Sequence, residues 1–356
     1  MIAATHLLRT VPSRILALDY LRGFFIIIII VDHLWRWPNL FEYVSGRGEL
    51  WVSAAEGFVI ISGLLVGYVR GYKNRHQPLA VVSKKLIKRG IILYIWMLIT
   101  TVLLVSASWT LHFKGNIGYV PINQGDWSSL FISVIRLDYV HSLTHFLYLY
   151  AIFLILSPLV IWLFRKNKSW LVAIIAILVW GAGIAFSIEW MQWQLLFFVP
   201  AIAGFYFESI LRFYRGLAVP TKQFVRFGSI AIMAVTVLAA MAIVIPNAPG
   251  EYKNSLFGHH PLTGLTVLLS FIWFVGLLSL FQLTLPFLKR WFGWLLLTIG
   301  ERSLTAYIIH IVPLVLCQLL FSNTDNIWIN SLLAVGSIIG TWALMKIPGV
   351  NRLIPR

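Results

Sequence analysis

The sequence predicts an all-α, polytopic integral membrane protein with about ten transmembrane helices. Hydrophobic residues make up 60% of the 356-residue chain and charged residues only 11%, whereas soluble domains are about one-quarter charged. The mean hydropathy is +0.86. Apolar runs long enough to cross the hydrocarbon layer recur along the whole chain, and helices are the spanning structure that such runs form.

Ten apolar windows define the expected helices. We find no internal repeat or linker, so we expect one membrane-embedded domain over residues 1–356. Pro158, Pro200 and Pro313 fall within windows and should kink or break them. The ninth window is too long for one straight crossing and should contain a turn near Gly293. The windows are 16–37, 51–69, 86–106, 142–164, 170–187, 194–211, 227–245, 263–285, 293–320 and 328–347.

The basic residues are distributed unevenly between the two sides of this arrangement. If both termini are cytoplasmic, 21 of the 28 Lys and Arg residues lie on the cytoplasmic side and five in the opposite loops. This asymmetry predicts cytoplasmic termini, a basic cytoplasmic loop at 70–89 and an external loop at 107–141. The basic cytoplasmic loops then explain the net charge of +16. We expect the lipid bilayer as a partner and no nucleic-acid binding.

The first window carries ionisable residues in two pairs. In LDYLRGFFIIIIIVDHLWRW, Asp19 and Arg22 lie near one end, and Asp32 and His33 near the other. Ionisable groups are costly inside a membrane and often mark functional sites. Arg22 and His33 are about 16 Å apart along a helix axis and share nearly one face. The alternatives to a functional role are structural. Asp19 and Arg22 could form an ion pair that anchors the helix, and His33 could lie at the membrane interface.

The second and sixth windows each contribute one candidate. Glu56, in ELWVSAAEGFVIISGLLVGY, should lie at a depth similar to that of His33. A glutamate at that depth needs a partner, water or a proton. Gln194, in EWMQWQLLFFVPAIAGFYFE, could belong to a sugar-binding surface, although the tryptophans around it are also typical of an interfacial aromatic belt.

The ninth window contains the segment IGERSLTAYIIHIVP. Ser303, Tyr307 and His310 are spaced i, i+4, i+7 and should share one helix face. This face is either a site or a hydrogen-bonded packing surface. Arg302, adjacent to it, needs a partner of its own. The single cysteine, Cys317, excludes an intramolecular disulfide and a cysteine-rich metal centre, and we assign no metal.

These segments resemble known families. Arg22, ten residues and His33 resemble the Arg-x10-His signature of the membrane acyltransferase superfamily called acyltransferase family three. More closely, LDYLRG, AAEGFVIISGLLVGY, WQLLFFVPAIAG and GERSLTAYIIH, with Tyr139 to Arg165 between the second and third, are similar to blocks of the OpgC family. That family is named for succinylation of osmoregulated periplasmic glucans. The resemblance extends in order over most of the chain, although Pro200 interrupts one block and the carboxyl tail is short.

The resemblance implies an acyl-CoA-dependent O-acyltransferase of the inner (plasma) membrane. It would move a succinyl or acetyl group from cytoplasmic acyl-CoA to a hydroxyl of a periplasmic or cell-surface glycan, with no permanently bound cofactor. His33 would be the general base, oriented by Glu56 or, with poorer geometry, Asp32.

The remaining candidates would bind the donor or stabilise the charge that forms during the reaction. The basic cytoplasmic mouth around Arg22 would attract the phosphates of CoA. Arg302, Ser303 or Tyr307 would stabilise the oxyanion. Asp19, His310 and Gln194 complete the expected substrate-binding set.

Two other classes of function remain open at this stage. Intramembrane His, Glu and Arg residues in proline-broken helices are also typical of proton-coupled transporters, here a transporter or flippase of a glycan-related substrate. A sensor or glycan-assembly partner without catalysis is the third class. Acyl transfer from labelled acyl-CoA, or uptake without acylation, would discriminate them.

Overall fold

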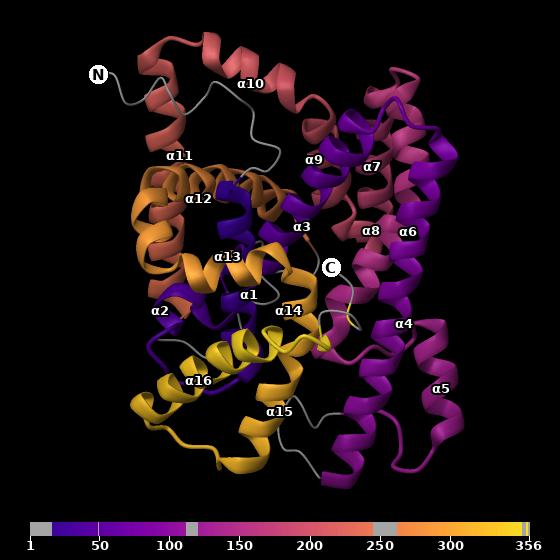
Figure 1. Cartoon of the computed structure of the whole chain (residues 1–356), viewed down its shortest axis with the longest axis vertical. Helices are drawn as coiled ribbons and strands as arrows, with labels where there is room; N and C mark the ends of the chain where they lie inside the picture. The colour runs from indigo at the N-terminus through magenta and orange to yellow at the C-terminus, as the bar shows by residue number, and fades with distance from the viewer. Residues whose placement is uncertain (1–15, 49, 112–119, 245–261, 351–353, 355–356) are drawn as a thin grey trace.

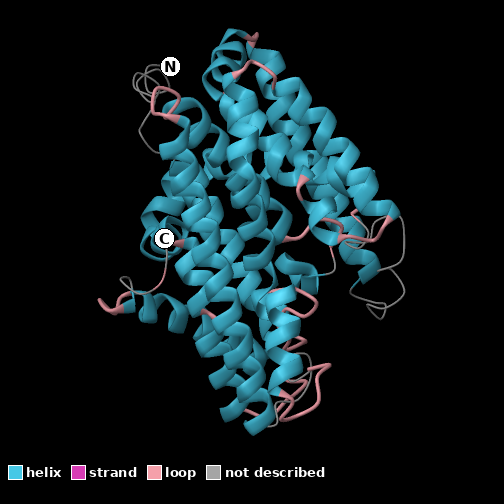
Figure 2. Cartoon of the chain, turned by 90° about the vertical axis from the view of Figure 1, so that its right-hand side faces the viewer, coloured by secondary structure: helices cyan, strands magenta, loops and turns pink. Residues whose placement is uncertain are grey.

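The computed structural model describes residues 16–48, 50–111, 120–244, 262–350 and 354. Every regular element within these ranges is a helix, and no strand occurs among them (Figure 2). The prediction that the fold is all-α is therefore confirmed for the described residues.

The helices have the following bounds. In chain order they are α1 (Leu16–Leu34), α2 (Glu42–Ser45), η2 (Gly46–Gly48), α3 (Ala54–Leu65), η3 (Val66–Lys73), α4 (Leu79–Leu111), α5 (Trp127–Arg136), η5 (Ser142–Thr144), α6 (His145–Arg165), α7 (Ser169–Ala185), α8 (Glu189–Trp193), α9 (Leu195–Phe205), α10 (Phe207–Gly216), α11 (Val219–Val244), α12 (Gly264–Trp291), α13 (Gly293–Glu301), α14 (Ser303–Ile309), α15 (Ile311–Leu320) and α16 (Ile327–Met345).

Within the described residues, seven helices are long and apolar enough to cross a membrane, or up to eight if the pair Glu189–Phe205 and Phe207–Gly216, bent by 68°, is one span. Each of the ten predicted windows coincides with one or more helices. This number is below ten partly because α1, 19 residues long, carries three charged residues and so does not count as apolar enough by composition. In addition, α7 has only 17 residues.

The ninth predicted window is divided into three short helices. α12 ends at Trp291 and α13 begins at Gly293, so the expected turn is present. Two further interruptions, at Arg302 and His310, separate α13, α14 and α15. Pro158 and Pro200, in contrast, lie inside the continuous helices α6 and α9.

Two predicted loops are partly helical. The basic segment 70–89 contains the end of η3, which is a π-helix, and the first turns of α4. The segment 107–141 contains the end of α4 and the whole of α5, which packs against α4. Residues 112–119 of this segment, and both chain ends, lie outside the described residues.

α1 lies at the centre of the bundle and packs against α3, α12, α13, α14 and α16 (Figure 1). Its closest neighbour is α13, because a glycine on each helix removes the side chain from the contact. A Cβ atom added at Gly23 would collide with the carbonyl oxygen of Leu296, and one at Gly300 with that of Asp19. Small residues allow this close backbone approach between membrane helices.

α11 is a peripheral helix. It packs chiefly against α12, and only 11% of its span Val219–Ala242 is buried. Met233 and Met241 of α11 form a small apolar cluster with Leu269 and Trp273 of α12, separate from the main hydrophobic core. The α11–α12 pair is therefore attached to the bundle along one side only.

Arg36, at the end of the first predicted window (16–37), is buried, with 3% of its surface exposed. Its guanidinium donates hydrogen bonds to the carbonyl oxygens of Cys317 (3.2 Å), Phe321 (2.5 Å) and Ser322 (2.6 Å). The carbonyl groups of Phe321 and Ser322 lie just past the end of α15, and that of Cys317 also accepts a hydrogen bond from the backbone N–H of Phe321. Arg36 therefore joins the end of α1 to the end of α15.

The close contact of α1 and α13 generates a stability prediction. We expect Gly300→Ala to lower the free energy of unfolding by about 1–3 kcal/mol, because the new methyl group forces two backbones apart. Chemical unfolding of the detergent-solubilised protein measures this change. Gly181→Ala is the control, since a Cβ at that position on α7 meets nothing within 4 Å, and we expect no loss there. Equal stability of the two variants would contradict the packing argument.

Candidate active site

Two polar contacts join α1 to α14. Nη2 of Arg22 donates a hydrogen bond to Oγ of Ser303 at 2.5 Å. Further along both helices, Nδ1 of His33 lies 3.0 Å from Nε2 of His310. From the first contact to the second, the residue numbers rise along both α1 and α14. The two helices therefore run side by side in parallel. The residues predicted at the two ends of α1 thus meet the residues predicted on one face of the ninth window.

The hydrogen-bond pattern determines the tautomers of the histidine pair when both rings are neutral. Nδ1 of His310 contacts the backbone carbonyl oxygen of Tyr307. A carbonyl can only accept, so this Nδ1 carries the proton and Nε2 of His310 is an acceptor. Nδ1 of His33 must then donate to it. The proton of His33 is therefore on Nδ1, and its Nε2 keeps a lone pair.

The two histidines differ in accessibility. His310 is completely buried, and His33 is half-buried. The ring of Tyr307 lies near both, with centroid distances of 6.2 Å to His33 and 5.1 Å to His310. The buried ring therefore serves as the inner partner, and the half-buried ring carries the nitrogen that a substrate could reach.

The Arg22 end of α1 is polar and cationic. Nη1 of Arg22 lies 3.9 Å from Oδ1 of Asp19, one turn earlier on the same helix, so the expected ion pair is present. A second pair of cations lies beside Tyr150 of α6, where the guanidinium of Arg89 of α4 is 6.0 Å from the ring centroid and Arg70 of η3 is close enough to Arg89 for their charges to repel. Repulsion between arginines in a partly buried place favours an anionic ligand.

Aromatic side chains connect this cationic end to the histidine pair. The guanidinium of Arg22 lies 5.8 Å from the ring centroid of Phe58. Phe58 packs edge-on against Phe146, at 5.0 Å, and Phe146 lies 5.5 Å from Tyr307. The backbone N–H of Phe146 also donates a hydrogen bond to the hydroxyl oxygen of Tyr307, at 3.3 Å. The route between the two ends therefore runs past apolar ring surfaces.

Glu56 belongs to the first turn of α3. Its carboxylate accepts hydrogen bonds from the backbone N–H of Ser53, at 2.8 Å, and from the Ser53 hydroxyl. Ser53 in turn caps the helix, so the two residues form a capping box. The sequence Ser-Ala-Ala-Glu carries this signature, which the sequence analysis did not use. Orientation of His33 by Glu56 stays a prediction, whereas the contact between His33 and His310 is present.

The other predicted site residues are divided between the two ends of α14. Arg302 lies at the break before α14, and Ser303 contacts Arg22. Both are about 10 Å or more along the helix from His310. Of the three predicted oxyanion stabilisers, Tyr307 is therefore the one beside His33. Asp32 faces the loop after α2, where a Cβ added at Gly48 would lie 3.6 Å from its Cγ.

Gln194 lies within a helix contact. It is 3% exposed, and its side-chain nitrogen donates to the carbonyl oxygens of Ala176 (2.7 Å) and Met191 (3.1 Å). Both donor hydrogens of the amide are used in this way. This environment favours a packing role over the sugar-binding role that the sequence suggested.

Three residues outside the predicted set lie near the histidine pair. His141 and His145 are close enough to act electrostatically on His33. Nε2 of His145 lies 2.8 Å from Oε2 of Glu189, which also accepts a hydrogen bond from the Tyr148 hydroxyl. The sequence alone did not place these histidines in the site. The i, i+4 spacing of His141 and His145 at the start of α6 was the available signal.

A metal centre is not evident in the described part of the chain, where no three His, Cys, Asp or Glu side chains converge. The chemistry that the site offers is therefore that of paired imidazoles and of arginines.

Comparison with known proteins places this arrangement in a family. No curated protein and no solved structure matches the chain. The family described as OpgC protein matches residues 14–349, which include α1 through α16 and every candidate residue discussed above. The chain is thus a multi-pass membrane protein that belongs to the OpgC family.

Proposed function

We propose that this protein is a transmembrane O-acyltransferase that moves an acyl group from acyl-CoA to a carbohydrate hydroxyl on the opposite side of the inner membrane. Membership of the OpgC family supports a transferase. The observation that carries the proposal is the His33–His310 contact, because its hydrogen-bond direction leaves a basic nitrogen on the half-buried ring.

In the proposed reaction, Nε2 of His33 removes the proton of the acceptor hydroxyl as its oxygen attacks the thioester carbonyl. A carbon–oxygen bond forms, and the tetrahedral intermediate collapses with cleavage of the carbon–sulfur bond. The proton on His33 passes to the departing thiolate, so the products are a sugar ester and free CoA. The Tyr307 hydroxyl, which accepts from Phe146 through its oxygen, can still donate its hydrogen to the oxyanion.

His310 acts as a positioning residue in this proposal. Its Nε2 accepts a hydrogen bond from Nδ1 of His33, and this bond strengthens when His33 becomes an imidazolium. The Tyr307 carbonyl holds His310 in the required tautomer. The same arrangement of base and orienting partner occurs in hydrolases that use a histidine.

The Arg22 end would receive the donor. Arg22, together with the separate pair Arg70 and Arg89, would provide the charge that CoA phosphates need, and arginine is well suited to phosphate binding. Arg22 and His33 are about 16 Å apart along α1. The pantetheine arm would span this distance along the aromatic route through Phe58 and Phe146. A succinyl or acetyl group and a periplasmic or surface glycan are the substrates we propose, in accord with the family.

The general-base role predicts a loss of turnover. We expect His33→Ala to reduce kcat for acyl transfer by about 10²–10⁴-fold, which is the usual contribution of a positioned base. The assay is transfer of radiolabelled acyl-CoA to a periplasmic glucan by the full-length protein in lipid vesicles. His76→Ala is the control, because His76 is an exposed histidine outside the site.

The role of His310 is tested with two variants in the same assay. His310→Leu should lower kcat by roughly up to tenfold, the equivalent of one neutral hydrogen bond, and leave KM unchanged. His310→Gln keeps an acceptor and should recover part of the loss.

Full activity of a folded His33→Ala protein would refute the proposal. Uptake of glycan without acylation would support the transporter alternative.

The donor-binding role predicts a change in affinity. We expect Arg22→Ala to raise KM for acyl-CoA by about 10–100-fold with a smaller effect on kcat, because a charged hydrogen bond contributes about 1.5–3 kcal/mol. Arg212→Ala, on an exposed surface of α10, should leave KM unchanged. If Arg22→Ala lowered kcat alone, Arg22 would not bind the donor.

The direction of transfer requires both termini, and the loop between η3 and α4, on the cytoplasmic side. In a Cys317→Ser background, His76→Cys should be protected from a membrane-impermeant maleimide added to intact cells. Asn323→Cys, between α15 and α16, should react rapidly because this loop is external in the same topology. The reverse labelling pattern would invert the proposed orientation.

A further inference from the structure

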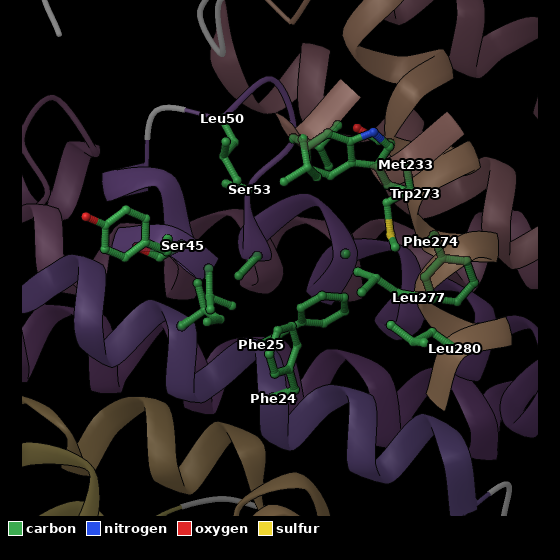
Figure 3. Close-up of a pocket in the computed structure, with 18 residues that line it drawn as sticks. Phe24, Phe25, Ser45, Leu50, Ser53, Met233, Trp273, Phe274, Leu277 and Leu280 are labelled. Carbon is green, nitrogen blue, oxygen red and sulfur yellow. The ribbon is translucent and has the colours of Figure 1, made fainter. Parts of the chain in front are cut away.

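A cavity of about 270 Å³ lies between α1 and α3 on one side and α11 and α12 on the other (Figure 3). Phe24, Phe25 and Ile28 of α1 form one wall. Trp273 and Leu277 of α12 belong to the opposite wall. The cavity is outside the arrangement of arginines and histidines described above.

The cavity lies where the main hydrophobic core meets a small second cluster. Phe25, Ile28 and Phe274 belong to the main core, whereas the small cluster contains Met233 of α11, Trp273 of α12, and Leu50 and Val52 from the segment before α3. Side chains from the two clusters do not fill the space where they meet. Because α11 is largely unburied, this seam lies next to the surrounding lipid.

The shape of the cavity suits one extended chain. On α12 its lining runs from Ser270 to Leu280, a length of about 15 Å at the rise of an α-helix. A cavity of this length and of about 270 Å³ can accommodate one extended hydrocarbon chain, whose carbon atoms approach other carbon atoms to about 4 Å. A second helix, about 10 Å wide, would not fit.

The chemistry of the lining favours an apolar ligand. Among the described residues that line the cavity, none is charged. Three of its polar groups bind within the protein: the Ser270 hydroxyl donates to the Thr266 carbonyl, the Trp273 indole N–H to the Thr236 hydroxyl and the Ser53 hydroxyl to the Glu56 carboxylate. Apolar cavities of about half this size stay free of water and take up apolar molecules.

We propose that this cavity binds one acyl chain of a bilayer phospholipid. The chain enters along the seam between α11 and the bundle and lies against Phe25, Trp273 and Leu277. Ser45 of α2 and Ser53, the N-cap of α3, also line the cavity. Ser53 belongs to the capping box that holds Glu56. The bound chain therefore supports the segment that joins α2 to α3. This inference does not depend on acyl transfer.

Photocrosslinking tests the proposal directly. The full-length protein is placed in phosphatidylglycerol vesicles that contain a small fraction of phosphatidylcholine with a diazirine in one acyl chain. We expect labelling of the peptides containing Phe25 and Trp273 to exceed, several-fold, that of the lipid-facing surface of α16 around Leu332, which is 71% exposed. Labelling equal to that of α16 would overturn the proposal.

A matched pair of variants on α11 locates the site. Val237 lines the cavity, so Val237→Trp should fill it and reduce labelling of Phe25 and Trp273 to the level of α16. Val235→Trp adds the same side chain two residues away, at a position that is 65% exposed, and should leave labelling unchanged. If Val237→Trp does not fold, the labelling ratio in the unaltered protein decides the question.

A competition experiment separates a phospholipid from another long-chain lipid. Unlabelled phosphatidylcholine added to these vesicles should reduce the labelling in proportion to its mole fraction. If a polyprenyl phosphate displaced the probe at a far lower mole fraction than phosphatidylcholine, the cavity would be a site for a lipid-linked carrier, and the phospholipid assignment would be wrong.

Discussion

The fold depends on placing a charged helix in the middle of an apolar bundle. α1 carries Asp19, Arg22 and His33, which would be expensive in contact with lipid. Its neighbours supply Ser303 and His310 as partners at the two ends, and the Gly23 and Gly300 contact brings α13 close enough to cover the charged end. Because these partners come from one segment of the chain, the position of α1 and that of the segment 293–320 are determined together.

The breaks in that segment explain how it can follow α1. A continuous helix from Gly293 to Leu320 would carry Gly300, Ser303 and His310 along one straight axis. Interruptions at Arg302 and His310 allow α13 to pack closely against the start of α1 and α14 to run beside it. The interruptions therefore serve the same purpose as the broken helices of many transporters, where irregular backbone is found beside a functional site.

Much of this could be predicted from the sequence. Apolar length indicated helices in all ten windows, the spacing of Arg22 and His33 placed them on one face, and the i, i+4, i+7 pattern indicated the face of Ser303 and His310. Pairing could not be predicted, because residues 277 positions apart have no local signal that links them. Glu56 shows a different limit of the sequence. Its burial was expected, but a buried carboxylate can either cap its own helix, as it does here, or orient a distant imidazole. The sequence does not distinguish these two roles.

Arg36 limits how the site can open. It lies three residues after His33, and its guanidinium is bound to three carbonyl groups at the end of α15. Breaking these bonds would leave a buried cation without compensation, at a cost of about 3–5 kcal/mol. The ends of α1 and α15 consequently move as one rigid body, and the half-buried ring of His33 moves with them. An opening that admits a bulky acceptor would therefore keep the Arg36 contacts and take place elsewhere in the bundle.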